Sequence, residues 1–140
     1  MANINKKIAG LGFTHIALKV NDFDKSWKFY EEVLGMTPTV GWGKPGSRIQ
    51  MFDIGDGGIV EMFEGGSDEI PAVGKYQHFA MCCEDVDAAY AAAIAGGAVS
   101  KIAPKDVPLD SHPYKMVLRI AFVYGPSGEE LEFFTSRRVD

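Results

Sequence analysis

Two histidines occupy equivalent positions in a segment of the sequence that occurs twice. His15 lies in the run FTHIALKV, which spans residues 13–20, and His78 lies in the run YQHFAMCC, which spans residues 76–83. The offset of 78 − 15 = 63 also pairs Asp22 with Asp85. A single histidine in an apolar run is typical of a hydrogen-bonded core residue, but the repeat indicates a role that the two histidines share.

Two glutamates recur in the same way near the end of each repeat. Glu61 lies in GGIVEMF, residues 57–63, and Glu132 lies in GEELEFF, residues 128–134, with an offset of 132 − 61 = 71. A carboxylate inside an apolar strand is costly to bury unless it is paired, hydrogen-bonded or bound to a metal. Each of the four residues could alone be satisfied by a core hydrogen bond or an ion pair at the rim. Their recurrence in register favours one shared site.

Two imidazoles and two carboxylates form a ligand set that suits a divalent first-row metal ion. We therefore predict one bound ion per site, of Ni, Co, Zn, Mn or Fe, held by His15, Glu61, His78 and Glu132. Four protein ligands leave about two positions of an octahedral ion for substrate oxygens or water. Such an ion acidifies a C–H bond next to a bound oxygen, and a neighbouring carboxylate can then move the proton.

The elements that must position these residues follow a β-α-β-β-β plan in the first half of the chain. In the strand predicted over 13–20, the side chains of residues 13, 15, 17 and 19 share one face because strand residues alternate. Asn21 and Asp22 are N-cap candidates for a helix with an apolar stripe that reaches Leu34 and ends at Gly35. A short strand over 37–40 and a hairpin over 48–54 and 58–63 complete the unit.

The second half repeats the plan after a linker over residues 66–74. Strands are predicted over 76–83, 99–102, 116–124 and 130–135, with one helix that ends at Gly96. The segment 103–115 contains three prolines and His112, and we predict that it forms a flap over the site. The fold class is thus α+β, with two tandem βαβββ modules, about 11–65 and 75–136, in a single domain over residues 1–140.

Composition excludes several classes of protein. The chain has 140 residues, a net charge of −5 and no cluster of Lys or Arg larger than a pair, which argues against nucleic acid as a partner. No apolar run approaches the roughly 20 residues that span a bilayer, and the N-terminus lacks a secretory signal. The two cysteines are adjacent, so a disulfide framework is not expected. We expect a cytoplasmic protein without a membrane partner.

The span from about Phe13 to Phe134 resembles the vicinal-oxygen-chelate superfamily, to which glyoxalase I belongs. The matching runs are THIALKVND (14–22), WKFY (27–30), VLGM (33–36), QHFA (77–80) and GPSG (125–128) ahead of Glu132. The resemblance implies two βαβββ modules whose curved sheets enclose a metal site. It carries the His-Glu-His-Glu ligand set over to the four residues named above.

The resemblance to glyoxalase I implies isomerisation of the hemithioacetal of methylglyoxal and glutathione through a metal-stabilised enediolate. Glu132 is the first candidate for the base and Glu61 the second. Lys19 stands where glyoxalase I has an arginine that contacts the glutathione carboxylate, so Lys19 and the flap residue His112 are candidates for substrate binding. The run MFEG (62–65) after Glu61 lacks the asparagine that glyoxalase I uses on glutathione. This departure counts against glutathione, which is kept as one possible co-substrate.

Other members of the superfamily define the alternatives. Epimerases of the methylmalonyl-CoA type use the same proton chemistry, with a glutamine at one ligand position where this chain has Glu61. Extradiol dioxygenases and fosfomycin-modifying transferases use two histidines and one glutamate. A non-catalytic binding protein like the bleomycin-resistance proteins is a further alternative. We expect a homodimer, in which the modules complete a site either within one chain or between two subunits.

Overall fold

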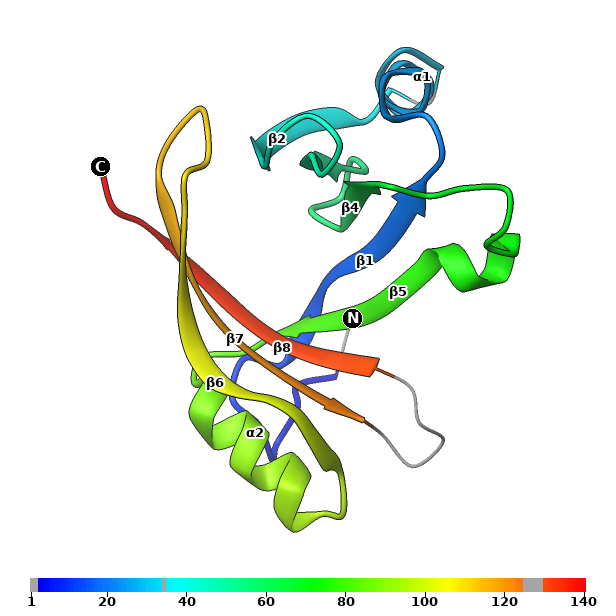
Figure 1. The fold of residues 1–140 in the computed structure, drawn as a ribbon. Coiled ribbons are helices and arrows are strands. Elements are labelled where there is room, and N and C mark those ends of the chain that lie inside the picture. Colours follow the sequence, from blue (N-terminus) through cyan, green and yellow to red (C-terminus); the bar gives the residue numbers. More distant parts are fainter. Residues whose placement is uncertain (1–2, 34, 125–129) are drawn as a thin grey trace.

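The computed structural model of the chain describes residues 3–33, 35–124 and 130–140. Within these ranges eight strands form one mixed sheet in the order β2-β3-β4-β1-β5-β8-β7-β6, which is curled into a half-barrel (Figure 1). The strands are β1 Gly12–Val20, β2 Thr37–Trp42, β3 Ile49–Asp53, β4 Ile59–Glu64, β5 Tyr76–Cys82, β6 Val99–Leu109, β7 Met116–Tyr124 and β8 Glu130–Arg138. The helical segments are α1 Phe23–Lys28, η1 Phe29–Val33, η2 Ala72–Lys75 and α2 Val86–Ala95.

The two halves of the chain have the same topology, which confirms the predicted pair of βαβββ modules. In each module the first strand lies parallel to the last, β1 to β4 and β5 to β8, and the remaining neighbours are antiparallel. The first strands β1 and β5 pair antiparallel at the centre, where Ile16 is opposite Phe79. This seam joins both modules into one sheet within a single chain.

Each module places a helix on the outer face of its strands. Phe23 of α1 packs with Val20, Phe52 and Met62, and Val86 of α2 packs with Val123 and Phe133. Asp22 is the N-cap of α1, as predicted, and its repeat partner Asp85 is the N-cap of α2. Their carboxylates accept hydrogen bonds from the backbone N–H groups of Lys25 (3.0 Å) and Ala88 (2.9 Å). No helix in the described ranges is long and apolar enough to cross a bilayer.

The first helix differs from its prediction in detail. After six residues α1 continues as the π-helical turn η1, and the Trp27 indole N–H donates to the Glu31 carboxylate at 2.7 Å. Gly35 follows with φ +74°, the left-handed conformation expected of a helix-ending glycine. Leu34, the last predicted stripe position, and the GPSG run at 125–128 lie outside the described residues.

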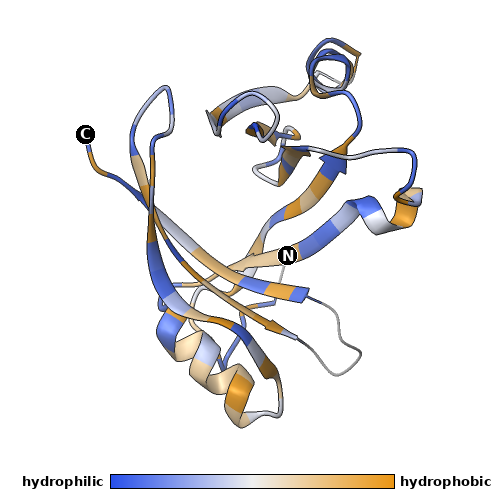
Figure 2. Cartoon of the chain, viewed as in Figure 1, coloured by the Kyte–Doolittle hydropathy of each residue, from blue (hydrophilic) through white to orange (hydrophobic). Residues whose placement is uncertain are grey.

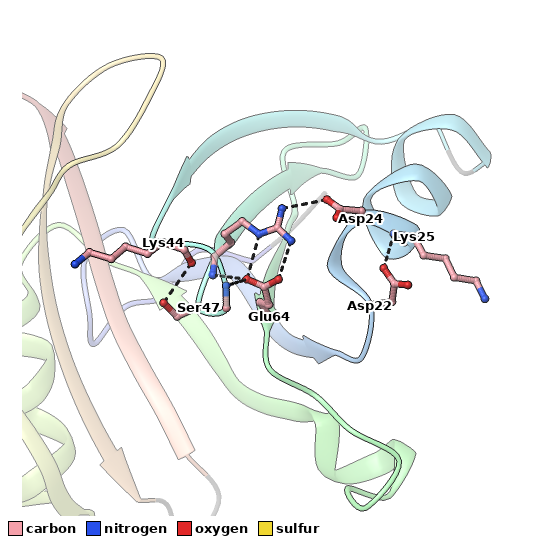
Figure 3. A network of polar contacts seen from close by, with 8 residues as sticks. Asp22, Asp24, Lys25, Lys44, Ser47 and Glu64 are labelled. Atoms are coloured by element: carbon pink, nitrogen blue, oxygen red, sulfur yellow. Dashed lines mark hydrogen bonds and ion pairs between the residues drawn. The ribbon is translucent and has the colours of Figure 1, made fainter.

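A network of polar contacts that includes Asp24 of α1 and Glu64 of β4 connects α1 to the sheet (Figure 3). The Arg48 guanidinium pairs with Glu64 of β4 at 2.7 Å and with Asp24 of α1 at 3.0 Å, and it lies 4.3 Å from the ring centroid of Phe23. The hydrogen bonds from Arg48 lower the pKa of Glu64 to about 2. The helix is thereby fixed over the strand that carries Glu61.

The prediction that residues 103–115 form a flap is wrong for most of this segment. Strand β6 continues to Leu109, and only residues 110–115 connect it to β7. Pro104 and Pro108 are tolerated because β6 is an edge strand, where a residue without an N–H group need not break a ladder. Two register irregularities between Ser100 and Lys105 accommodate the rest of the segment.

The β6–β7 hairpin contacts the opposite edge of the sheet. Gly41 of β2 and His112 at the hairpin tip exchange two backbone hydrogen bonds, each of 3.2 Å. Ser111 beside them is 1% exposed, and its hydroxyl donates to the carbonyl of Tyr114 at 2.7 Å. The two edge strands of the half-barrel are therefore tied together at one end.

Candidate metal centre

Four neighbouring strands bring the predicted ligands together on the inner face of the sheet. His15 lies on β1, Glu61 on β4, His78 on β5 and Glu132 on β8, and the strand order β4-β1-β5-β8 makes these strands adjacent. The register supports the placement, since Glu61 is opposite Ala17 and Glu132 is opposite Ala80. All four residues come from one chain, two from each module.

Three of the ligand atoms form a tight triangle. The Nε2 atoms of His15 and His78 lie 3.2 Å apart, and Glu132 Oε2 lies 3.0 Å from the first and 2.9 Å from the second. Glu61 stands at the side of this triangle, with its Oε2 atom 3.4 Å from His15 Nε2. The two glutamates are equivalent in the repeat but not in the site.

The site is buried, and its charges perturb one another. His15 is 0% exposed, Glu132 is 4% exposed and Glu61 is 6% exposed. Burial raises the pKa of Glu61, and the neighbouring carboxylate of Glu132 adds to the rise. Burial opposes ionisation of Glu132 as well, but the two imidazoles beside it lower its pKa below the ordinary value. Burial disfavours the charged form of His15, yet Glu132 and Glu61 raise its pKa.

The polar atoms of the triangle are incompletely satisfied by the protein. Glu132 Oε2 lies close to both imidazoles, but neither approach has hydrogen-bond geometry, and no other described residue bonds it. His15 Nδ1 likewise lacks a partner in the described ranges. Leaving a buried carboxylate oxygen unbonded costs roughly 1–3 kcal/mol or more. A cation among these atoms would remove that cost.

The spacing of the triangle fits a metal ion. With metal–ligand bonds of about 2.1 Å, adjacent ligands of an octahedral ion lie about 3.0 Å apart. The three measured separations of 2.9, 3.0 and 3.2 Å bracket this value. His15, His78 and Glu132 thus form a group able to hold an ion, as the donor set predicts.

Aromatic rings surround both imidazoles. The rings of His15 and Phe134 meet edge to face with centroids 5.2 Å apart, and those of His78 and Phe122 meet in the same way at 5.1 Å. Metal-binding histidines usually donate their second N–H to an acceptor, which fixes the ring. Among the described residues, His15 Nδ1 has no such acceptor, and the packing of Phe134 against the imidazole orients the ring instead.

A cavity of about 400 Å³ opens beside the triangle. Its lining comes from both modules and comprises Lys19, Trp42, Ile49, Glu61, Phe63, Gln77, His78, Lys101, Ile102, Val107, Leu109, Leu118, Ile120, Phe122, Glu130, Glu132 and Phe134. Lys19 therefore faces the same space as the metal ligands, as strand alternation predicts.

His112 does not join the other candidates. Its side chain is exposed and does not line the cavity, and its backbone forms the bridge to Gly41. Sequence reasoning missed the lining residues on β7, Leu118, Ile120 and Phe122, although their two-residue spacing was a usable signal. It also missed Lys101, whose ammonium pairs with Glu130, because nothing in the local sequence indicates that contact.

The paired βαβββ modules, the curled sheet and the inward-facing histidines and glutamates define the glyoxalase-like α+β fold. Residues 12–133 match the profile of the Glyoxalase/Bleomycin resistance protein/Dioxygenase superfamily, and the chain belongs to this superfamily. Its members include metal-dependent enzymes, such as epimerases, that act on small molecules.

Individual proteins resemble the chain to different degrees. The uncharacterised protein YwbC of Bacillus subtilis (strain 168) is 32% identical over 124 residues, which cover 86% of this chain and 94% of that protein. A hypothetical protein from Bacillus halodurans C-125 superposes with a TM-score of 0.69 at 19% identity, covering 93% of this chain and 98% of its own. Methylmalonyl-CoA epimerase from Mycobacterium tuberculosis gives a TM-score of 0.65 at 17% identity, with coverages of 96% and 91%. These two structures share the fold.

Proposed function

We propose that the chain is a metal-dependent isomerase or lyase that moves a proton at a carbon next to two substrate oxygens. The triangle of His15, His78 and Glu132 at the edge of a cavity is the observation that carries this proposal. The bound ion would supply Lewis-acid activation of the substrate oxygens. The chain's own residues hold the ion, bind the substrate and carry the proton.

The geometry supports different roles for the two glutamates. Glu132 Oε2 is in contact with both imidazoles and suits a ligand. Glu61 Oε2 lies 3.4 Å from the nearest imidazole nitrogen and also lines the cavity, so it is placed to exchange a proton with a substrate. We therefore propose Glu61 as the proton carrier, which reverses the order expected from the sequence. Glu61 remains a candidate fourth ligand.

Lys19 supports an anionic substrate. It lines the cavity two residues beyond Ala17 on the inner face of β1, and the described residues form no ion pair with it. A substrate whose carboxylate or phosphate group binds Lys19 would place that group at the rim of the cavity. Its reactive carbon would then lie toward Glu61. The glutathione hemithioacetal expected from the resemblance to glyoxalase I meets this requirement, and so does an acyl thioester acid.

Epimerisation is the second candidate reaction. Solved structures with this fold include methylmalonyl-CoA epimerases from Mycobacterium tuberculosis and Streptomyces coelicolor, and a further methylmalonyl-CoA epimerase structure contains methylmalonyl-CoA. Both reactions begin with removal of a proton next to a chelated oxygen. They differ in where the proton returns, to the neighbouring carbon in the lyase reaction and to the opposite face of the same carbon in epimerisation.

Metal content and proton exchange test the proposal together. Protein purified without chelator should contain about one divalent ion per chain, and His78→Ala should lose it while the exposed-site control Glu69→Gln keeps it. In ²H₂O, proton NMR should show deuterium in the lactoyl thioester formed from the methylglyoxal–glutathione adduct for a lyase, or at the carbon that epimerises in methylmalonyl-CoA for an epimerase. Metal-replete protein that binds no ion would overturn the proposal.

We also propose a homodimer. Phe13 and Phe79 lie on the outer face of the seam with ring centroids 5.5 Å apart, and they are 50% and 40% exposed. The prediction that Phe13 shares a face with His15 is wrong, because a register irregularity between these two residues turns Phe13 to the other face. Such a pair of large apolar side chains favours a contact with another copy of the chain. Phe79→Glu should give the monomeric mass in light scattering if this face forms the dimer.

A further inference from the structure

The cavity extends from the metal triangle along β7 and β8. Glu132 of β8 is opposite Phe122 of β7, and the ring of Phe122 packs against His78. Four residues earlier on β7, Leu118 also lines the cavity, and four residues of extended strand span about 13 Å. The cavity therefore extends well beyond the ligands toward the β6–β7 hairpin.

The two ends of the cavity differ in chemistry. The charged and amide side chains of the lining, apart from the metal ligands, are Lys19, Gln77, Lys101 and Glu130. Register places all four at one end. Gln77 is the second residue of β5, Glu130 begins β8, and Lys101 lies near the start of β6. Lys19 follows Leu18, which is opposite Tyr76 at the start of β5. We call these four residues the polar rim.

The other end is apolar throughout. Five lining residues from β2, β6 and β7 belong to one hydrophobic cluster and carry no polar side-chain group except the indole N–H of the tryptophan: Trp42, Val107, Leu109, Leu118 and Ile120. We call them the apolar wall. β7, which supplies two of them, is hydrophobic along most of its length (Figure 2). A cavity end lined in this way has few groups that can hydrogen-bond to a substrate, so it suits a hydrocarbon.

The wall is held in place by the hairpin bridge. Trp42 directly follows Gly41, and Leu109 lies three residues before His112, the two residues that exchange backbone hydrogen bonds. Val107 is in turn opposite Leu118 across β6 and β7. The bridge thus holds the β2 side and the β6–β7 side of the apolar wall together. A substrate group can then lie between the two sides.

The geometry points to a substrate that carries a hydrocarbon group of several carbons beside its pair of chelating oxygens. The hydrocarbon lies along the apolar wall, the oxygens reach the metal triangle and an anionic end lies at the polar rim. This inference rests on the proposed function and narrows its substrate class. A methyl group, as in the methylglyoxal adduct, would leave most of the apolar end unfilled.

Alkyl hydroxamates of increasing length test this inference, because each presents two neighbouring oxygens to a metal. Binding of acetohydroxamate, hexanohydroxamate and octanohydroxamate to the Co²⁺-loaded protein is followed by the visible absorption of the ion. The affinity should rise roughly fourfold for each added methylene until the wall is filled. Acetohydroxamate itself reports on the metal site alone.

Matched variants on β6 show which part of the cavity lining causes the gain in affinity with chain length. Leu109→Asn should remove most of the gain from acetohydroxamate to octanohydroxamate, whereas Ile102→Asn, which changes a lining residue near the polar rim, should leave it. Val107→Thr, which adds a hydroxyl with little change of shape, should reduce the gain if Leu109→Asn does not fold. Equal affinities for the three hydroxamates, or equal losses in Leu109→Asn and Ile102→Asn, would overturn the inference alone. Failure of Co²⁺ to bind would overturn the proposed function and the inference with it.

Discussion

Glu61 and Glu132 hold equivalent positions in the two modules, yet their surroundings differ. Glu132 is close to both imidazoles, whereas Glu61 is close to one. The repeat in the sequence predicted that all four residues share one site, because both offsets are visible in the chain itself, and the structure brings the four side chains together. It could not distinguish the two glutamates, since the asymmetry arises from the packing of β4 and β8 against different neighbours.

Substitution of the two glutamates should separate binding from proton transfer. Glu132→Gln should weaken Co²⁺ binding by more than the roughly 10- to 100-fold that loss of an outer partner costs. Glu61→Gln should weaken it less, while abolishing proton exchange on the substrate. Isothermal titration with Co²⁺ measures the first effect and ²H incorporation the second. The reverse pattern would assign the base to Glu132.

The ion pair of Arg48 and Glu64 should make folding stability depend on pH. The pKa of Glu64 is about 2 in the folded chain and near 4.5 when the chain is unfolded. A lowered pKa stabilises the fold above the unfolded value, and this stabilisation is lost as the pH falls from about 4.5 toward 2. Urea midpoints of wild type and Glu64→Gln should therefore differ at pH 6 and converge near pH 2. A constant difference across this range would contradict the assignment.

At the scale of the elements, β6 shows where sequence patterns are insufficient. Prolines indicate a loop, but an edge strand tolerates residues without an N–H group, so β6 runs through Pro104 and Pro108. Edge position is a property of the whole sheet and cannot be read from the segment. The helices and the 49–64 hairpin were predictable because capping residues, turn glycines and apolar periodicity act locally.

Removal of the Ser111 hydroxyl should loosen the hairpin that closes the half-barrel. Ser111→Ala leaves the carbonyl of Tyr114 without its 2.7 Å hydrogen bond, which should cost about 1 kcal/mol of unfolding free energy. Hydrogen exchange at the amides of Gly41 and His112 should accelerate as well. Ser47→Ala, at an exposed position with a longer 3.4 Å bond, is the control and should change stability by less than about 0.5 kcal/mol. Unchanged exchange at Gly41 would show that Ser111 does not support the bridge.

At the scale of the whole molecule, the antiparallel seam of β1 and β5 decides how the site is completed. The sequence left open whether the modules combine within one chain or between two, because both arrangements use the same modules and the same ligands. Within the single chain the seam brings the two modules together, since His15 of β1 lies opposite Ala80 of β5. A homodimer, if it forms, is therefore not required to assemble the ligands.

Complementation between variants tests this assembly directly. His15→Ala and His78→Ala each remove one ligand of the triangle, so each should lose metal binding. When the two variants are unfolded, mixed and refolded together, no intact site should form, because each chain builds its site from its own two modules. Ligands shared between subunits would instead restore about a quarter of the sites in a random mixture of dimers. Co²⁺ content of the refolded mixture measures the outcome, with refolded wild type as the control for recovery. Recovery near one quarter of the wild-type value would show that the modules exchange between chains in solution.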